Sequence, residues 1–409
     1  MNLKSIYNNI SSYSERNQFG ILTVLIITIG SLWRIWNVGA FHGFSIMEKT
    51  NLAVFTKVIN NSWIIQQKEI YRALYVYLQS SLIFLSGYDV STYRLLNVII
   101  MISLLVVFFL FVRTWFNKQV AILSTLFMAT SAPIIIFSRI VSEIGIIVLL
   151  QFLILLLLTY AFRDKKKYLF LLAGLVSALG IFTSPIFVLS GALLAVVAFV
   201  IMLKNTKFIS MFVYELLFLI LPIMISAVIY IVFLPDFYSN ISYIVTPGSF
   251  LLFSQNIGNN VLALMGNSIY ATPYNVGSEP ILDPFLAVSA ICGIIYAFFH
   301  AGKRKHQFLL MWLLFGLVII SLSGKQIFDY LLIVLPTIYI FSALLFDYLL
   351  TSWTKTFPYN KNARLIMTLV FSLFVFLSVY YNYQKFFLGW LGSNTIRSQF
   401  TNSITIIKK

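Results

Sequence analysis

Long apolar segments separated by short polar ones dominate this chain from end to end. A helix needs roughly 20 apolar residues to cross the hydrocarbon core of a membrane, and stretches of about that length recur along the sequence. The pattern predicts about eleven transmembrane helices, near residues 19–38, 90–112, 118–138, 141–162, 168–184, 186–203, 208–234, 282–301, 307–323, 327–350 and 364–383. The expected fold is therefore all-α, that of a polytopic membrane protein.

Two segments after the first predicted span differ from the others. Segment 70–87 is apolar but slightly short for a crossing, and counting it as a span would place the basic run 163–167 outside the cell. Residues 49–65 have the spacing of an amphipathic helix. Their apolar positions on one face are Leu52, Phe55 and Ile59. We therefore predict two interfacial helices that face outward within an outer loop, 39–89.

Composition and charge agree with a membrane protein. The chain is 60% hydrophobic and only 10% charged, and its mean hydropathy is +0.93. The net charge of +16 comes mostly from bases in short loops between spans, which favours topology signals and anionic lipid headgroups over a nucleic-acid partner. The positive-inside rule predicts a cytoplasmic N-terminus at 1–18, a transmembrane domain at 19–383, a second outer loop at 235–281 and an outer-surface tail at 384–409. We expect a prokaryotic plasma membrane, since no organelle-targeting segment is present.

Several signatures of soluble enzymes are missing from the sequence. It contains no Walker A loop, no GxGxxG after a strand, no HExxH and no Cys/His cluster, and Cys292 is its single cysteine. No cofactor is therefore firmly indicated. Without a nucleotide site, the energy for any reaction must come from the substrate or from an ion gradient.

Ionisable residues are scarce, with 12 acids among 409 residues, so their gathering beside one membrane face indicates a site. Three groups are predicted to lie outside: Gly43 to Glu48; Lys68, Glu69 and Arg72; and Arg139 with Glu143. His42 lies beside the first group. Arg139 and Glu143 are four residues apart and would share a face on a continuous helix. A carboxylate here could accept a proton from an attacking hydroxyl or bind a divalent cation such as Mg²⁺ or Mn²⁺, and a base could hold a phosphate.

The order of these features resembles the GT-C superfamily of membrane glycosyltransferases, especially relatives of protein O-mannosyltransferases and the lipid A aminoarabinose transferase. That family has a G-x-x-x-D-E motif after its first helix, which Gly43 to Glu48 occupies here. Further matches follow in order along residues 20–350: Phe84 to Asp89, Tyr93-Arg94-Leu95, Ser131-Ala132-Pro133, Ser138-Arg139 with Glu143, Gly174 to Thr183, Asn256 to Asn260, Pro280 to Pro284, and Asp329-Tyr330 with Leu335-Pro336.

The resemblance implies a reaction on the outer membrane face. A sugar would pass, with inversion, from a polyprenyl-phosphate donor to a hydroxyl on a lipid, glycan or protein acceptor. Glu48 and Glu143 would be the catalytic residues, Glu48 as the base and Glu143 as the second acidic residue lining the cavity, and Arg72, Lys68 and Arg139 would bind the donor phosphate. Glu69 and His42 would line the cavity or hold a metal. The Asp of the family's Asp-Glu pair is Met47 here, so either Glu48 takes over as base or the site is inactive.

Two alternatives remain open. A transporter or flippase would need polar residues near the midplane of its spans, and the acids available for this, Glu215 and Asp347, fall near predicted cytoplasmic helix ends. An inactive GT-C-like protein that binds polyprenyl lipid would explain Met47.

Overall fold

The computed structural model describes residues 3–41, 43–61, 63–66, 70, 72–184, 186–188, 219–228, 250–266, 275–322 and 328–400. Every element with defined bounds in these ranges is a helix. The elements before the first long gap are α1 (Leu3–Ile35), α2 (Ile46–Asn60), α3 (Ala73–Ser86), α4 (Val90–Trp115), α5 (Lys118–Thr130), α6 (Ala132–Ser138), α7 (Ile144–Asp164) and α8 (Lys167–Ile181). Those after it are α12 (Phe250–Met265), α13 (Pro284–Phe299), α14 (Arg304–Leu322), the 3₁₀ helix η2 (Phe328–Ile333), α15 (Leu335–Thr356), α16 (Lys361–Tyr383), the π-helix η3 (Gln384–Trp390) and α17 (Asn394–Arg397).

The all-α prediction is confirmed for the described residues. Six of their helices are long and apolar enough to cross a membrane, or seven if α5 and α6 form one broken span. The predicted number of about eleven is not confirmed. Several predicted spans correspond to shorter helices such as α8 and α13, and the predicted spans 186–203 and 208–234 lie largely outside the described residues. The chain is a multi-pass membrane protein.

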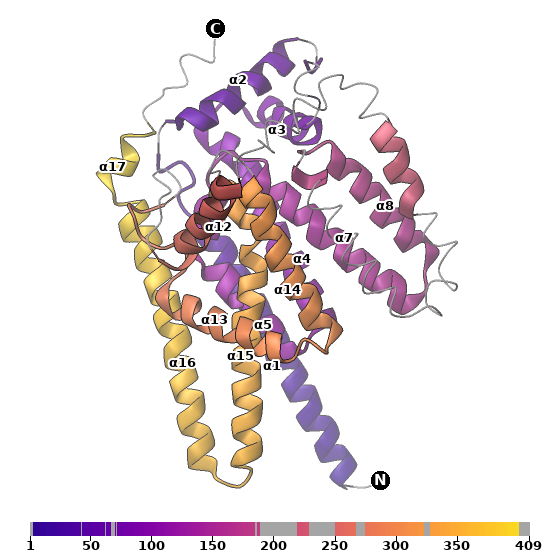
Figure 1. The fold of residues 1–409 in the computed structure, drawn as a ribbon, viewed down its shortest axis with the longest axis vertical. Coiled ribbons are helices and arrows are strands. Elements are labelled where there is room, and N and C mark those ends of the chain that lie inside the picture. The colour runs from indigo at the N-terminus through magenta and orange to yellow at the C-terminus, as the bar shows by residue number, and fades with distance from the viewer. Residues whose placement is uncertain are drawn as a thin grey trace.

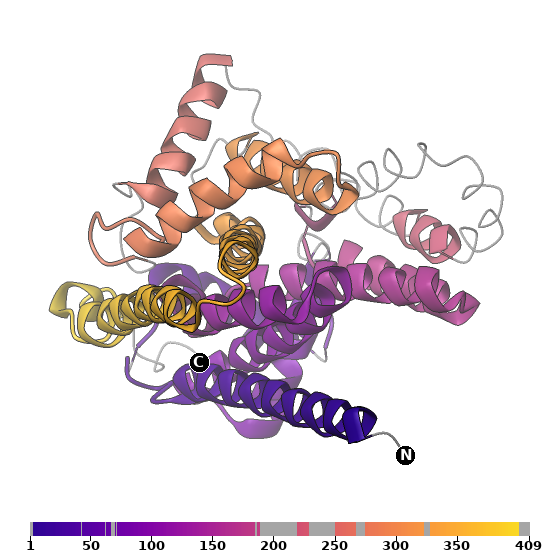
Figure 2. The same ribbon diagram turned by 90° about the horizontal axis from the view of Figure 1, so that it is seen from below.

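The long helices form one bundle, and the two short helices α2 and α3 cover one end of it (Figure 1). The N-terminus of α1 lies at the opposite end, whereas α17 lies near α2. Seen from below, α1 lies along one side of the bundle and α13 and α14 lie on the other (Figure 2). Leu52 and Phe55 are fully buried, so α2 packs on the bundle through the apolar face that the sequence predicts.

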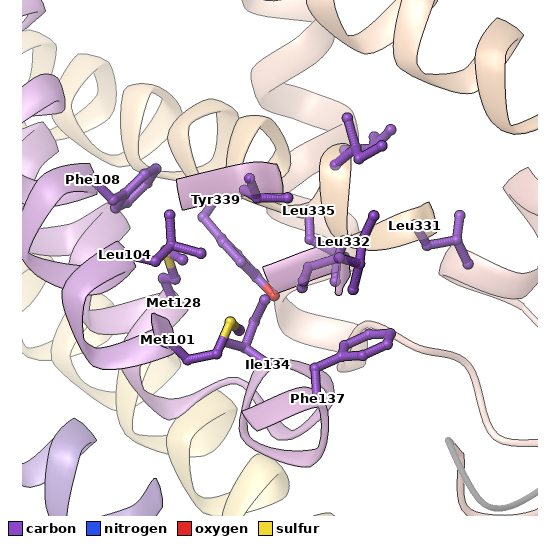
Figure 3. Close-up of a cluster of buried hydrophobic side chains, with 14 of the residues drawn as sticks. Met101, Leu104, Phe108, Met128, Ile134, Phe137, Leu331, Leu332, Leu335 and Tyr339 are labelled. Carbon is purple, nitrogen blue, oxygen red and sulfur yellow. The ribbon is translucent and has the colours of Figure 1, made fainter. Parts of the chain in front are cut away.

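The core beneath α2 and α3 is made by α4, α5, α6, η2 and α15. Their side chains interlock around the phenol of Tyr339 (Figure 3), and those buried here include Met101, Leu104, Met128, Ile134, Leu332 and Leu335. Close packing of this kind favours a rigid platform. The elements above it are therefore presented on a fixed base.

The fifth helix breaks before it can run straight through the bundle. α5 and α6 meet at an angle of 60°, and Pro133 lies in the first turn of α6. Proline has no N–H, so the carbonyl of Ala129, four residues earlier, cannot receive its helical hydrogen bond. Arg34 of α1 donates instead, with Nη1 at 3.0 Å from the oxygen of Ala129 and Nη2 at 3.1 Å from that of Met128.

Other helices supply partners for the remaining polar groups of this break. The N–H of Ala132 donates to Oδ1 of Asn382 on α16 at 2.8 Å, and Nδ2 of Asn382 donates to Asp283 at 2.7 Å. The hydroxyls of Ser131 and Tyr339 lie 2.7 Å apart. Four helices besides α5 and α6, or residues at their ends, thus fix the direction of α6. That direction carries the chain to the end of the bundle covered by α2 and α3.

Candidate functional site

The first turn of α2 holds Glu48 in place. Ser45 and Glu48 form a capping box: the N–H of Ser45 donates to Glu48 Oε2 at 2.8 Å, and the N–H of Glu48 donates to Ser45 Oγ at 3.3 Å. This exchange pairs backbone N–H groups that would otherwise have no partner at a helix start. The carboxylate of Glu48 is therefore bound to its own helix and is fully buried.

Arg94, near the start of α4, is the counter-ion of Glu48. Its Nε lies 3.2 Å from Oε1 and its Nη2 lies 3.3 Å from Oε2, and both side chains are inaccessible to solvent. The same guanidinium donates to the carbonyls of Phe41 at 3.0 Å and Gly43 at 2.9 Å. A planar guanidinium suits such two-point recognition. The pair thus holds the turn between α1 and α2 against α4.

The connector between α6 and α7, residues 139–143, is held by side chains from α2 and α4. The N–H of Val141 donates to Glu48 Oε1 at 3.2 Å, and the carbonyl of Val141 accepts from Asn51 at 3.1 Å. Asn97 donates to the carbonyls of Ile140 and Ser142. These bonds replace the hydrogen bonds that a non-helical connector cannot make within itself. Glu48 therefore fixes the connector that ends at Glu143, where α7 begins.

Arg72, Glu143 and Tyr75 complete the arrangement. Arg72 precedes α3, is nearly buried, and donates to Asn51 Oδ1 at 2.7 Å. The Tyr75 hydroxyl donates to Asn97 at 2.9 Å. Burial raises the pKa of Tyr75 well above its usual value, the negative charges of Glu143 and Glu48 raise it further, and Arg72 opposes them. Asn51 links Arg72 to the carbonyl of Val141, two residues before Glu143.

Arg139 has a different place from the one its spacing predicts. The chain is not helical between Ser138 and Ile144, so the continuous helix on which Arg139 and Glu143 would share a face does not form. Arg139 instead caps the end of α1 by donating to the carbonyls of Trp33 at 2.8 Å and Asn37 at 3.1 Å, and to that of Trp36. Carbonyls at a helix end have no partner within the helix and favour a cation.

Of the predicted site residues, the structure brings Glu48, Glu143 and Arg72 together around α2, α3 and the connector, with Arg139 at the connector's start. Their roles in a reaction remain predictions. Lys68, Glu69 and His42 lie outside the described residues. Within the described ranges, no three His, Cys, Asp or Glu side chains gather closely enough to hold a metal ion.

Sequence reasoning gave no site role to four residues that organise the site: Arg94, Asn51, Asn97 and Tyr75. Arg94 carried a signal, since it lies in the Tyr93-Arg94-Leu95 match and an ionisable residue that opens a strongly apolar helix needs a partner. Asn51, Asn97 and Tyr75 carried none, since neutral polar residues near a helix end are common. Their roles depend on a connector whose path the sequence does not specify.

No protein-family model matches the sequence, and no curated protein matches it. Solved structures do match. ArnT from Cupriavidus metallidurans, bound to undecaprenyl phosphate, superposes with a TM-score of 0.61 at 11% identity, covering 92% of this chain and 76% of that one. The archaeal oligosaccharyltransferase AglB from Archaeoglobus fulgidus, in complex with an inhibitory peptide and a dolichol-phosphate, gives 0.60 at 14% identity, covering 91% and 56%. The chain has the GT-C fold.

The resemblance noted in the sequence motifs is thereby confirmed at the level of the fold. The apo state of the same ArnT superposes similarly, with a TM-score of 0.62 at 12% identity over 95% of this chain. The chain spans little more than half of AglB. Identities this low establish the shared GT-C fold and no more, so the activity must be argued from the site itself.

Proposed function

We propose that this protein is a membrane glycosyltransferase that moves a sugar from a polyprenyl-phosphate donor to a hydroxyl group on a lipid, glycan or protein acceptor. The observation that carries the proposal is the gathering of Glu48, Glu143 and Arg72 at one end of a GT-C bundle. Solved neighbours of this fold hold undecaprenyl phosphate and dolichol-phosphate. A donor of that chemical class therefore suits the proposal.

The two acids would have different roles. Both oxygens of Glu48 accept hydrogen bonds from Arg94, and each accepts one more from a backbone N–H. With two hydrogen bonds to each oxygen and a fully buried side chain, Glu48 has no free position at which an acceptor hydroxyl could bind. Glu143 is partly exposed at the end of the connector, which makes it the better base. Glu48 would then act as the residue that positions Glu143. The resemblance alone assigns the role of base to Glu48 instead.

The reaction would be a single displacement. Glu143 would take the proton of the acceptor hydroxyl while the hydroxyl oxygen attacks the anomeric carbon of the sugar. The bond from that carbon to the phosphate oxygen would break on the opposite face, which inverts the configuration, and the polyprenyl phosphate would leave with both bonding electrons. Arg72, with Lys68, would neutralise the charge that develops on the phosphate.

Orientation and metal dependence belong to the proposal as well. The excess of bases in the predicted inner loops supports a cytoplasmic N-terminus and a site on the outer face of the membrane. The membrane would be a prokaryotic plasma membrane. A divalent cation such as Mg²⁺ or Mn²⁺ is supported by the resemblance alone. Transfer measured with and without a chelator tests whether the reaction needs a metal.

Transfer of labelled sugar from a polyprenyl-phosphate pool, in membranes that contain the wild type or a variant, tests the proposal. Glu143→Gln should abolish transfer, Glu48→Gln should reduce it, and Met47→Asp should keep or raise it. Transfer only after Met47→Asp would indicate a decayed transferase that binds polyprenyl lipid. Absence of transfer in the wild type and in all three variants, across a broad donor set, would reject the proposal and favour transport.

A further inference from the structure

The chain does not end at the tip of its last long helix but returns to the site. We call residues Gln384–Phe400 the C-terminal segment; it comprises η3, α17 and the residues around them. The sequence predicts an outer-surface tail from 384 onward, yet four apolar side chains of this segment are buried in the main core cluster. They are Phe386, Trp390, Ile396 and Phe400.

Two of these rings enclose Phe41, which lies in the turn between α1 and α2. The ring of Phe400 stacks on that of Phe41 with centroids 4.5 Å apart and planes 4° apart. The edge of Trp390 meets the same ring at 4.7 Å. Aromatic pairs at such distances are stabilising beyond the area they bury. The turn is therefore held both by the C-terminal segment and by Arg94, which donates to the carbonyl of Phe41.

The same segment covers both arginines that bind this turn and the end of α1. Phe400 lies over the guanidinium of Arg94 at 5.3 Å, and Phe386 lies over that of Arg139 at 4.7 Å. A guanidinium over an aromatic face is stabilised by the ring quadrupole, most strongly where water is excluded, and both arginines are buried. Because Arg94 also binds Glu48, each step from Phe400 to Glu48 is a direct contact.

We propose that the C-terminal segment positions the candidate site: Phe400, with Trp390, fixes Arg94 and the turn before α2, and through Arg94 fixes Glu48 and the connector that ends at Glu143. Phe400 touches no substrate in this proposal and acts only through Arg94. Its effect on catalysis rests on the proposed function. Its effect on the turn does not, so the two can be tested separately.

Hydrogen–deuterium exchange of the full-length protein in lipid nanodiscs tests the coupling without any substrate. Phe400→Leu keeps an apolar side chain but removes the ring, whereas Phe400→Tyr keeps the ring. Phe298→Leu, which alters an exposed ring on α13, is the matched control. Exchange of residues 36–48 should rise in Phe400→Leu and stay at the wild-type level in Phe400→Tyr and Phe298→Leu. Unchanged exchange of this stretch in Phe400→Leu would overturn the inference.

Steady-state transfer, normalised to folded protein, tests the consequence for catalysis. Loss of one buried cation–π contact should lower kcat roughly fivefold while the KM for the donor stays nearly constant, because Phe400 acts on the base and not on donor binding. Phe400→Tyr should restore the rate. Raised exchange with an unchanged kcat would overturn the positioning role. If the wild type makes no product, the proposed function fails, and the exchange experiment still decides whether the segment holds the turn.

Discussion

Arg34 places Nη1 3.0 Å from the carbonyl of Ala129, where the missing N–H of Pro133 would otherwise have bonded. Its Nη2 donates to the carbonyl of Met128, which in a regular helix would accept from the N–H of Ala132; that N–H donates to Asn382 instead. A buried cation in an apolar span normally indicates a binding site. Here its first role is to stabilise a broken helix. The break directs α6 toward the connector at 139–143. By stabilising the break, Arg34 therefore helps to fix the position of the candidate site.

Replacing Arg34 by methionine should destabilise the fold strongly. Two buried carbonyls would lose their donors, at about 1–3 kcal/mol each, and α6 would lose part of the network that sets its direction. We expect a lower thermal unfolding midpoint in nanodiscs and loss of transfer. Arg163→Met is the control, because Arg163 forms an exposed pair with Asp164, and such pairs contribute little. Equal midpoints for the two variants would contradict the role of Arg34.

The buried pair of Glu48 and Arg94 should behave as one unit in a double-mutant cycle. Glu48→Gln leaves Arg94 buried without a counter-ion, and Arg94→Met leaves Glu48 in the same state; each should cost about 3–5 kcal/mol. The double variant removes both charges and should cost clearly less than the sum. Unfolding free energies of the four proteins give the coupling. Additive losses would show that the two groups do not depend on each other.

Glu143→Gln should separate chemistry from folding. Glu143 is partly exposed at the end of the connector, so its neutral isostere should leave the unfolding midpoint almost unchanged. Loss of a general base should lower kcat by about 100-fold or more. Asp164→Asn, which changes an acid whose ion pair with Arg163 is exposed, should leave both quantities nearly as they are, because exposed pairs contribute little. Wild-type rates in Glu143→Gln would remove it from the proposed mechanism.

Much of the fold follows from the sequence because a membrane span depends on local composition. The apolar stretches near 90–112 and 141–162 correspond to α4 and α7. The short helices α2 and α3 follow from length and period in the same way. The number of spans does not, because a helix of 15 or 16 residues, such as α8 or α13, lies below the length that distinguishes a crossing from a buried helix.

The candidate site was harder to predict, since its residues act across the fold. Ser45-Ile46-Met47-Glu48 matches a family motif for a catalytic acid, but it is equally the S-x-x-E pattern of a capping box. The structure shows that Glu48 forms the capping box with Ser45, whatever its part in catalysis. The spacing of Arg139 and Glu143 does not fix their relation, because the chain between α6 and α7 is not helical. Contacts such as Phe400 with Phe41 join chain ends hundreds of residues apart and leave no local signal.

The pairing of α13 with α15 provides a last prediction, independent of the site. A Cβ built on Gly293 of α13 would fall on the backbone carbonyl of Phe341 in α15, so only glycine permits this approach, as is common where small residues let membrane helices meet closely. Gly293→Ala should therefore cost about 1–3 kcal/mol through overpacking. Gly20→Ala is the matched control within α1, because nothing lies within 4 Å of its Cβ position. It should leave the unfolding midpoint unchanged or raise it slightly, since alanine favours a helix. If both variants unfold at the same temperature, α13 and α15 do not approach as closely as the structure places them.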